Sequence, residues 1–294
     1  MKTNIWNVLC YSQEQAHNTI LNTLDDMGME MEWKYGSYIV ANVDVCNPKP
    51  MLCIHIDTIN THNSKRLPEA EDFNIVEGII MLDTDSNLSC LGADDRAGMY
   101  AMLEVLADEG IADKYCYGIF WDEEIGGVGS SQYIKDYKEY EEGVTCFIGL
   151  DRRGNNELAL YGSDNQELIS IFTDRGYIEA TGSFTDASNL AYTKACVNLS
   201  VGYENEHTPK ECLDLEGLTT CINTIKNKEV IELLSSKEYL IEGDYYEDFA
   251  YNEDMWDKLE AYENFIEMMG YVPKEVVEDY LYGGSIVNQW NEKY

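Results

Sequence analysis

Histidine and carboxylate side chains recur in five short segments of the sequence. Four of the segments directly follow an apolar run, and the fifth opens a predicted helix. The segments are His55-Ile56-Asp57, Gly92-Ala93-Asp94-Asp95, Glu123-Glu124, Asp151 and His207-Thr208-Pro209. Ligands collect outside the carboxyl ends of the strands in parallel α/β sheets. Polar residues that follow apolar strands are therefore expected to meet at one edge of a sheet.

The chemistry of this set favours metal ions. Two imidazoles and at least three carboxylates repel one another as bare charges, and crowding raises the pKa values of the carboxyls. A pair of divalent cations removes that conflict. The mixed set suits zinc, with cobalt or manganese as substitutes, and contains no thiolate of the kind found in structural zinc sites. Two metals about 3.5–4 Å apart form a hydrolytic centre that binds water and polarises a carbonyl.

The histidines carry most of this information. The chain has 55 acidic residues, so the pair Glu123-Glu124 alone means little. Only four histidines occur, and two of them lie in the five segments. A single histidine after a strand is more often structural than functional. Two histidines that occur together with three carboxylates at the ends of predicted strands favour a functional site.

The order His-x-Asp, Asp-Asp, Glu-Glu, Asp, His-Thr-Pro resembles that of the co-catalytic di-zinc exopeptidases. This superfamily comprises zinc aminopeptidases, carboxypeptidase G-type enzymes, tripeptidase T-like enzymes and aminoacylases. The resemblance covers about residues 50–215. Its most specific parts are Gly-Ala-Asp-Asp-Arg-Ala-Gly from residue 92 and Trp-Asp-Glu-Glu-Ile-Gly-Gly-Val-Gly-Ser from residue 121.

The resemblance implies a complete set of metal ligands. His55 and Asp151 would bind one metal, Glu124 and His207 would bind the other, and Asp94 would bridge the two. Each metal would then keep open positions for water and substrate, as catalytic sites require.

The resemblance also implies roles for residues beside the ligands. Asp57 would orient the imidazole of His55 without touching a metal. Glu123 would be the general base and acid, which takes a proton from the attacking water and returns it to the leaving amine. The peptide bond after Asp94 is usually cis in these enzymes.

One departure from the superfamily narrows the expected activity. The carboxypeptidase and acylase branches insert a lid domain between the fourth and fifth ligand segments, but only 55 residues separate Asp151 from His207 here. The chain therefore looks closest to the single-domain aminopeptidases, and we expect a metal-dependent aminopeptidase that hydrolyses short peptides. Two alternatives remain: an amidase or deacylase with the same centre, and a non-catalytic binding protein that keeps the fold.

The elements that must position these residues follow from hydrophobic periodicity. Apolar runs at 51–56, 75–82, 116–121, 145–150 and 197–201 predict strands, and residues 33–45 predict a hairpin. Helical spacing predicts helices at about 13–27, 95–108, 130–138, 165–174, 186–192 and 213–235. Strands that alternate with helices predict an α/β fold, with a mainly parallel central mixed sheet and helices on both faces.

The end of the chain differs in composition. Residues 238–294 contain fifteen acidic residues, three lysines and thirteen aromatic residues. So many aromatic residues argue against a purely disordered tail. We expect a catalytic domain over residues 1–237 and a small helical appendage over 238–294, with helices at 253–269 and 274–282.

Charge and cysteine content restrict partners and compartment. The chain carries 20 basic and 55 acidic residues, a formal net charge of −35, which disfavours nucleic acids and anionic membranes. Its nine cysteines contain no CxxC pair, so we expect reduced thiols and a cytoplasmic protein. No signal peptide or membrane span is evident from the apolar runs. The expected partner is a peptide, and the oligomeric state stays open.

Five further residues are weaker candidates. Asp186 resembles a Thr-Asp element near the site of related enzymes, but an N-cap for the following helix explains it equally well. Arg152 and Arg153 are expected to pair with carboxylates, and binding of a substrate carboxylate is the alternative. His62 is interpreted as a surface residue with a smaller chance of substrate contact. His17 is interpreted as structural.

Overall fold

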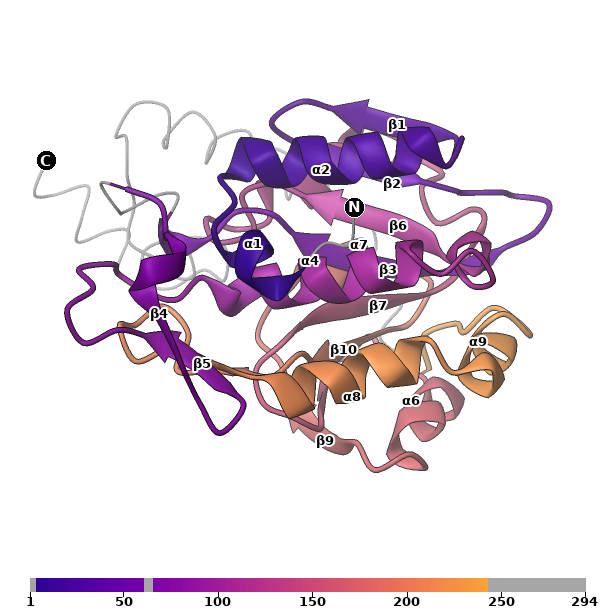
Figure 1. Cartoon of the computed structure of the whole chain (residues 1–294). Helices are drawn as coiled ribbons and strands as arrows, with labels where there is room; N and C mark the ends of the chain where they lie inside the picture. Colours follow the sequence, from indigo (N-terminus) through magenta and orange to yellow (C-terminus); the bar gives the residue numbers. More distant parts are fainter. Residues whose placement is uncertain (1–3, 61–65, 243–294) are drawn as a thin grey trace, which may run out of the picture. The chain divides into compact units, whose positions relative to one another are not determined.

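The computed structural model describes residues 4–60 and 66–242 (Figure 1). Its main sheet has eight strands in the order β1-β2-β6-β3-β7-β10-β8-β9. The central strands are parallel: β3 (Lys49–His55) lies between β6 (Cys116–Phe120) and β7 (Val144–Arg152), and β7 also pairs with β10 (Cys196–Ser200). The predicted mixed, mainly parallel sheet is confirmed.

The outer strands complete this sheet. The predicted hairpin is present as β1 (Met31–Lys34) and β2 (Tyr38–Ala41), which are antiparallel. At the other edge, β8 (Glu157–Leu160) runs antiparallel to β10, and β9 (Ile178–Thr181) runs parallel to β8. The apolar pattern did not predict these two short strands, and most of β9 is exposed.

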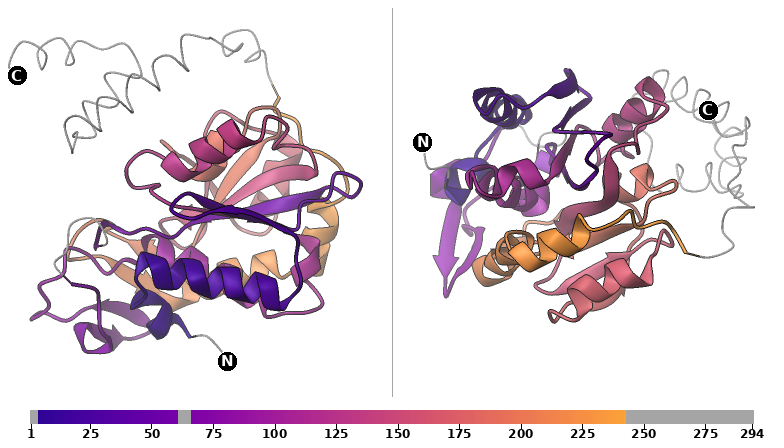
Figure 2. Two further views of the ribbon diagram at one scale, coloured as in Figure 1. Left: turned by 90° about the horizontal axis from the view of Figure 1, so that it is seen from above. Right: turned by 90° about the vertical axis from the view of Figure 1, so that its right-hand side faces the viewer.

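Helices cover both faces of the main sheet, as the left view of Figure 2 shows. The side chains of β3 alternate between two core clusters: Leu52 and Ile54 belong to one, Met51 and Cys53 to the other. The first cluster includes residues of α2 (Gln13–Asp26), α4 (Ala93–Leu106) and α8 (Leu215–Ile225). The second includes residues of α5 (Val128–Asp136) and α7 (Asp186–Leu190).

The other helices of residues 4–60 and 66–242 whose bounds are known are short. They are α1 (Ile5–Leu9), α6 (Gln166–Thr173), α9 (Lys228–Leu234) and the 3-10 turns Ala70–Asp72 and Ala112–Lys114. The single helix predicted over 213–235 is divided into α8 and α9. The first part ends with Lys226 as its C-cap, and Asn227 caps the second, because its side chain accepts hydrogen bonds from the N–H groups of Glu229 and Val230. Among residues 4–60 and 66–242, no helix is long and apolar enough to cross a membrane.

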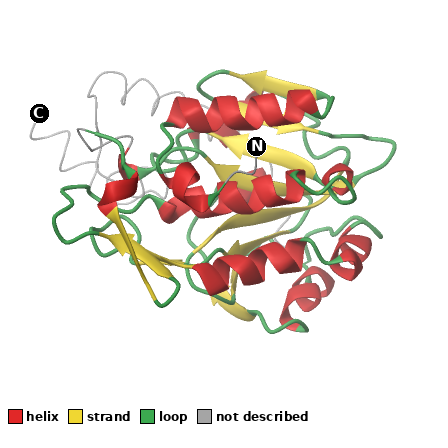
Figure 3. Ribbon diagram, viewed as in Figure 1, coloured by secondary structure: helices red, strands yellow, loops and turns green. Residues whose placement is uncertain are grey.

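A second sheet of four strands carries one of the candidate segments (Figure 3). Its order is β11 (Tyr203–Glu204), β12 (Cys212–Asp214), β5 (Ile79–Leu82), β4 (Phe73–Val76). The predicted strand run at 75–82 is thus a hairpin, which turns at Glu77 and Gly78. The loop between β11 and β12 contains His207.

The chain continues past residue 237 along the main sheet. Tyr239 is buried and its N–H donates to the carbonyl of Thr145 at 2.8 Å. Glu238 forms an ion pair with Lys194. The domain boundary at 237/238 stays a prediction, and most of the predicted appendage, with its helices at 253–269 and 274–282, lies outside the described residues.

Candidate metal centre

The parallel register brings the strand-end residues to one edge of the main sheet. Cys53 of β3 pairs with Gly149 of β7, so His55 and Asp151, each two residues further along, lie level with each other. Glu123-Glu124 follows the end of β6, the other neighbour of β3. Three of the five segments therefore follow neighbouring strands and meet at the carboxyl ends of these strands, as the sequence predicted.

The first group of possible ligands contains His55, Asp94 and Asp151. Nε2 of His55 lies 3.0 Å from Oδ1 of Asp94 and 3.5 Å from Oδ1 of Asp151. The three side chains offer ligand atoms that all lie within 4.8 Å of one another. His55 is buried, and Asp94 is supplied by the start of α4.

The second group contains Asp94, Glu124 and His207. Nε2 of His207 lies 3.1 Å from Oδ2 of Asp94 and 2.8 Å from Oε2 of Glu124. Asp94 thus belongs to both groups: Oδ1 faces one histidine and Oδ2 faces the other. Its peptide bond to Asp95 is cis, as the resemblance implied.

The charges in these groups fit divalent cations. Burial and the Asp94 carboxylate raise the pKa of Glu124 to about 7 and that of Asp151 to about 6. Hydrogen bonds to Asp94 and Glu124 raise the pKa of His207 to about 11. Oε1 of Glu124 is buried, and no described residue bonds to it. A buried oxygen without a partner is costly, and a cation would satisfy it.

Asp57 holds two of the candidate segments together. Its Oδ1 accepts a hydrogen bond from the N–H of Glu123 at 3.1 Å, and its Oδ2 accepts one from the N–H of Glu124 at 3.2 Å. Oδ1 also lies 3.3 Å from Nδ1 of His55. The side chain is fully buried. It faces the imidazole, and in addition it fixes the turn that follows β6.

Glu123 belongs to neither group of possible ligands. It lies in the turn that starts after β6, where its carbonyl accepts hydrogen bonds from the N–H groups of Gly126 and Gly127. Burial raises the pKa of its carboxyl well above the ordinary value, and the negative charges of Asp151 and Asp186 act in the same direction. A carboxyl with a raised pKa beside such groups is suited to carry a proton.

The Thr-Asp element at the start of α7 faces the centre from the other side. Thr185 is the N-cap, and Asp186 is the first residue of the helix. Thr185 Oγ1 donates to Oδ2 of Asp151 at 3.2 Å. Asp186 is buried and accepts a hydrogen bond from Ser130 Oγ. The N-cap interpretation of Asp186 is therefore wrong by one residue, and Thr185 is the residue that touches a possible ligand.

The other weak candidates have ordinary partners. Arg152 pairs with Glu157 at 2.7 Å, and Arg153 pairs with Glu206 at 3.1 Å. These are the carboxylate pairs expected from the sequence.

The two remaining histidines have separate outcomes. His17 is buried in an aromatic cluster, where Nδ1 accepts a hydrogen bond from Trp121 Nε1 at 3.2 Å. This position agrees with the structural interpretation. His62 lies outside the described residues.

Two buried carboxylates beside the centre were given no role from the sequence. Asp95 accepts hydrogen bonds from the N–H groups of His55 at 3.2 Å and Gly98 at 2.9 Å. Glu211 is fully buried and bonds to the backbone on either side of Ala93. Asp95 directly follows Asp94, a possible ligand, so the Asp-Asp motif indicated its position. Glu211 carries no such signal among 55 acidic residues.

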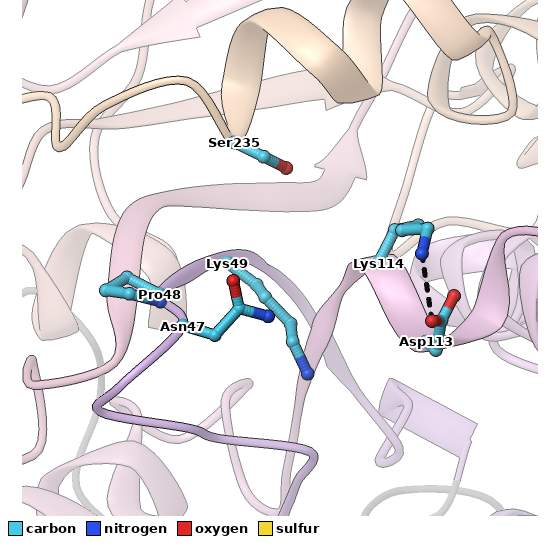
Figure 4. Close-up of a pocket in the computed structure, with 6 residues that line it drawn as sticks. All are labelled: Asn47, Pro48, Lys49, Asp113, Lys114 and Ser235. Carbon is cyan, nitrogen blue, oxygen red and sulfur yellow. Dashed lines mark hydrogen bonds and ion pairs between the residues drawn. The ribbon is translucent and has the colours of Figure 1, made fainter.

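A cavity of about 270 Å³ lies elsewhere (Figure 4). Its lining residues are Asn47, Pro48, Lys49, Asp113, Lys114 and Ser235. Lys49 is the first residue of β3 and His55 is the last, so this cavity is at the opposite end of the strand from the centre. Lys114 is paired with Asp113 at 2.9 Å. The cavity contributes nothing to the candidate site.

No protein-family model and no curated protein sequence matches the chain. Solved structures do. Aminopeptidase PepT from Bacillus cereus has a TM-score of 0.56 at 14% identity, over 79% of this chain and 97% of that one. A tripeptidase from Staphylococcus aureus has a TM-score of 0.57 at 13% identity, over 79% and 97%. The TET1 peptidase of Pyrococcus horikoshii has a TM-score of 0.53 at 13% identity, over 76% and 94%.

These identities are low, so the likeness is one of fold. The match extends over nearly the whole length of each of the three peptidases. The resemblance drawn from the five segments is confirmed at this level: the chain has the α/β fold of these peptidases.

Proposed function

We propose that the chain is a metal-dependent exopeptidase, an aminopeptidase that hydrolyses short peptides with two divalent cations, zinc or, in its place, cobalt or manganese. The observation that supports this most is the position of Asp94. Its two oxygens face His55 at 3.0 Å and His207 at 3.1 Å, so one carboxylate is shared by two groups of possible ligands. The fold of known peptidases gives independent support.

In this proposal, each cation has two ligands of its own. His55 and Asp151 hold one, Glu124 and His207 hold the other, and Asp94 contacts both. Three protein ligands for each cation leave positions open for water and substrate. Zinc is favoured by the imidazoles in the set, since carboxylates alone would suit magnesium or calcium.

When bound, such cations polarise the scissile carbonyl and make a bound water more acidic. Glu123 would accept the proton of the water that attacks the carbonyl carbon. It then gives the proton to the amine nitrogen as the C–N bond breaks. Asp57 keeps the turn that carries Glu123 fixed relative to β3.

The free thiols support a reducing compartment. All nine cysteines are free, and six of them are buried. Free thiols persist in the cytosol and are rare in secreted proteins. We therefore place the proposed enzyme in the cytoplasm.

The test uses purified full-length protein and three classes of substrate: peptides with a free amino terminus, N-acyl amino acids, and peptides blocked at the amino terminus. We expect hydrolysis of the first class, loss of activity with 1,10-phenanthroline, and no loss with the non-chelating 1,7-isomer. Hydrolysis of N-acyl amino acids alone would replace the aminopeptidase with a deacylase. No hydrolysis with zinc, cobalt or manganese would favour a binding protein.

A further inference from the structure

We infer that Glu211 is a positioning residue that couples the two halves of the proposed metal centre. It fixes Asp94, the shared ligand, relative to His207, which serves one cation only. This inference rests on the proposed function and adds to it a residue that touches neither cation.

Both carboxylate oxygens of Glu211 are engaged with one loop. Oε1 accepts a hydrogen bond from the N–H of Asp94 at 3.0 Å, and Oε2 accepts one from the N–H of Gly92 at 3.0 Å. The residue is fully buried, and it belongs to neither group of possible ligands. Glu211 therefore acts on the backbone of Asp94 and leaves the Asp94 side chain free for cations.

The two N–H groups need this partner. They lie in the turn that leads into α4, where the backbone at Asp94 and Asp95 is not helical, so neither N–H group has an acceptor within the helix. A buried carboxylate is costly unless hydrogen bonds compensate it. Here the hydrogen bonds come from the loop that carries Asp94, the shared ligand. A displacement of this loop would affect both cations.

The backbone of the same residue is tied to His207 through a short loop. The N–H of Glu211 donates to the carbonyl of Thr208 at 3.0 Å, and Thr208 Oγ1 donates to the carbonyl of Asn205 at 2.7 Å. Asn205 and His207 have φ angles of 57° and 62°, an uncommon region for residues other than glycine. Such a loop keeps its shape only where its surroundings hold it. A shift of Glu211 is therefore passed on to His207.

The test is cation titration of the chelator-stripped full chain by calorimetry with zinc. Glu211→Gln keeps the size of the side chain but turns an NH₂ group toward one of the two N–H donors. We expect the weaker of two zinc equivalents to lose affinity by about 10- to 100-fold, as is usual when an outer partner of a ligand is removed. In a His207→Ala background, which keeps only the His55 side, the same change should lower affinity by less, because Glu211 then acts on the remaining zinc through Asp94 alone.

Glu141 offers a matched control. Its carboxylate also accepts backbone hydrogen bonds, from the N–H groups of Tyr192, Thr193 and Lys194. It lies before the first residue of β7, whereas Asp151 lies near the last. Glu141→Gln should lower the unfolding temperature and leave both zinc affinities unchanged.

The outcomes separate the two claims. Wild-type protein that binds no zinc overturns the proposed function and this inference with it. Wild-type protein that binds two equivalents, with Glu211→Gln indistinguishable from it, overturns the inference alone. Equal losses of affinity in Glu141→Gln also overturn it, because they would show a general effect of stability. If Glu211→Gln does not fold, Glu211→Asp, which keeps the charge on a shorter side chain, is read by the same criteria.

Discussion

At the scale of single residues, the centre has too few positive charges for its carboxylates. Arg96 is the buried guanidinium beside it, and burial lowers its pKa to about 10. Its hydrogen bonds go to the carbonyls of Ile56 at 2.7 Å and Tyr11 at 3.1 Å. These hydrogen bonds hold the backbone in place and do not reach the carboxylates that face the histidines.

Removal of the proposed base tests whether Glu123 acts in catalysis without binding a metal. Glu123→Gln should lower kcat by about 100- to 10,000-fold, the usual contribution of a general base, and leave zinc content unchanged. Turnover and metal content are measured on the same preparation. Glu139→Gln, at an exposed glutamate, is the control and should change neither quantity. Near-normal hydrolysis by Glu123→Gln would remove this residue from the mechanism.

His207 should serve one cation only. His207→Ala is expected to reduce the zinc content by one equivalent per chain, because His55 and Asp151 still hold the other. Elemental analysis after dialysis measures the content. Lys210→Ala changes an exposed residue of the same loop and should keep both equivalents. Unchanged stoichiometry in the His207 variant would contradict the proposed ligand set.

The sequence revealed residues whose types are rare and missed those whose types are common. Two of four histidines marked the centre, and the carboxylates could be found beside them. Glu211 could not be found in this way, because its role depends on two backbone N–H groups that are 117 and 119 residues away. The role of Thr185 could not be predicted either, because it depends on a hydrogen bond from its hydroxyl to Asp151, 34 residues away.

At the scale of elements, the centre depends on close packing of α4 against β7. A Cβ atom at Gly98 would lie 1.9 Å from the carbonyl oxygen of Leu150 and 2.3 Å from Oδ1 of Asp95. Glycine is therefore required for α4 to approach the strand that ends near Asp151. Asp94 lies at the beginning of the same helix, so the approach of helix and strand sets the distance between two possible ligands.

Gly98→Ala should move these elements apart. Overpacking of this kind costs about 1–3 kcal/mol, and we expect the free energy of unfolding in urea to fall by that amount and zinc affinity to fall with it. Gly110→Ala is the control, because the nearest atom to its added Cβ would be 3.4 Å away. Equal stability of the two variants would show that α4 and β7 are not held by this contact.

The elements that the sequence predicted are those with strong periodicity. The helix expected over 13–27 is present as Gln13–Asp26, with a capping box formed by Ser12 and Gln15. The central strands were found because they are buried on both faces. Assignment of 75–82 to a separate sheet could not be predicted, since pairing of β5 with β12 joins residues more than 130 positions apart.

At the scale of the whole molecule, a net charge of −35 favours the uptake of cations, and uptake must displace protons. The pKa of His207 is raised to about 11 and that of Glu124 to about 7, so both groups carry protons at pH 7 in the absence of a cation, His207 fully and Glu124 in part. Metal ligands must be deprotonated. Zinc binding at pH 7 should therefore release at least one proton, and affinity should fall as the pH falls.

Calorimetry in buffers of different ionisation enthalpy measures this release. The observed enthalpy should change with the buffer for wild-type protein and change less for His207→Ala. An enthalpy that does not depend on the buffer would show that these groups are not the ligands.

The most direct test of the shared carboxylate is anomalous X-ray diffraction at the zinc edge, on crystals of the full chain grown with zinc. The account predicts two peaks on either side of the Asp94 carboxylate, about 3.5–4 Å apart. One peak should lie beside His55 and Asp151, and the other beside Glu124 and His207. A single peak that leaves either histidine without a metal, or no peak next to Asp94, would contradict the account.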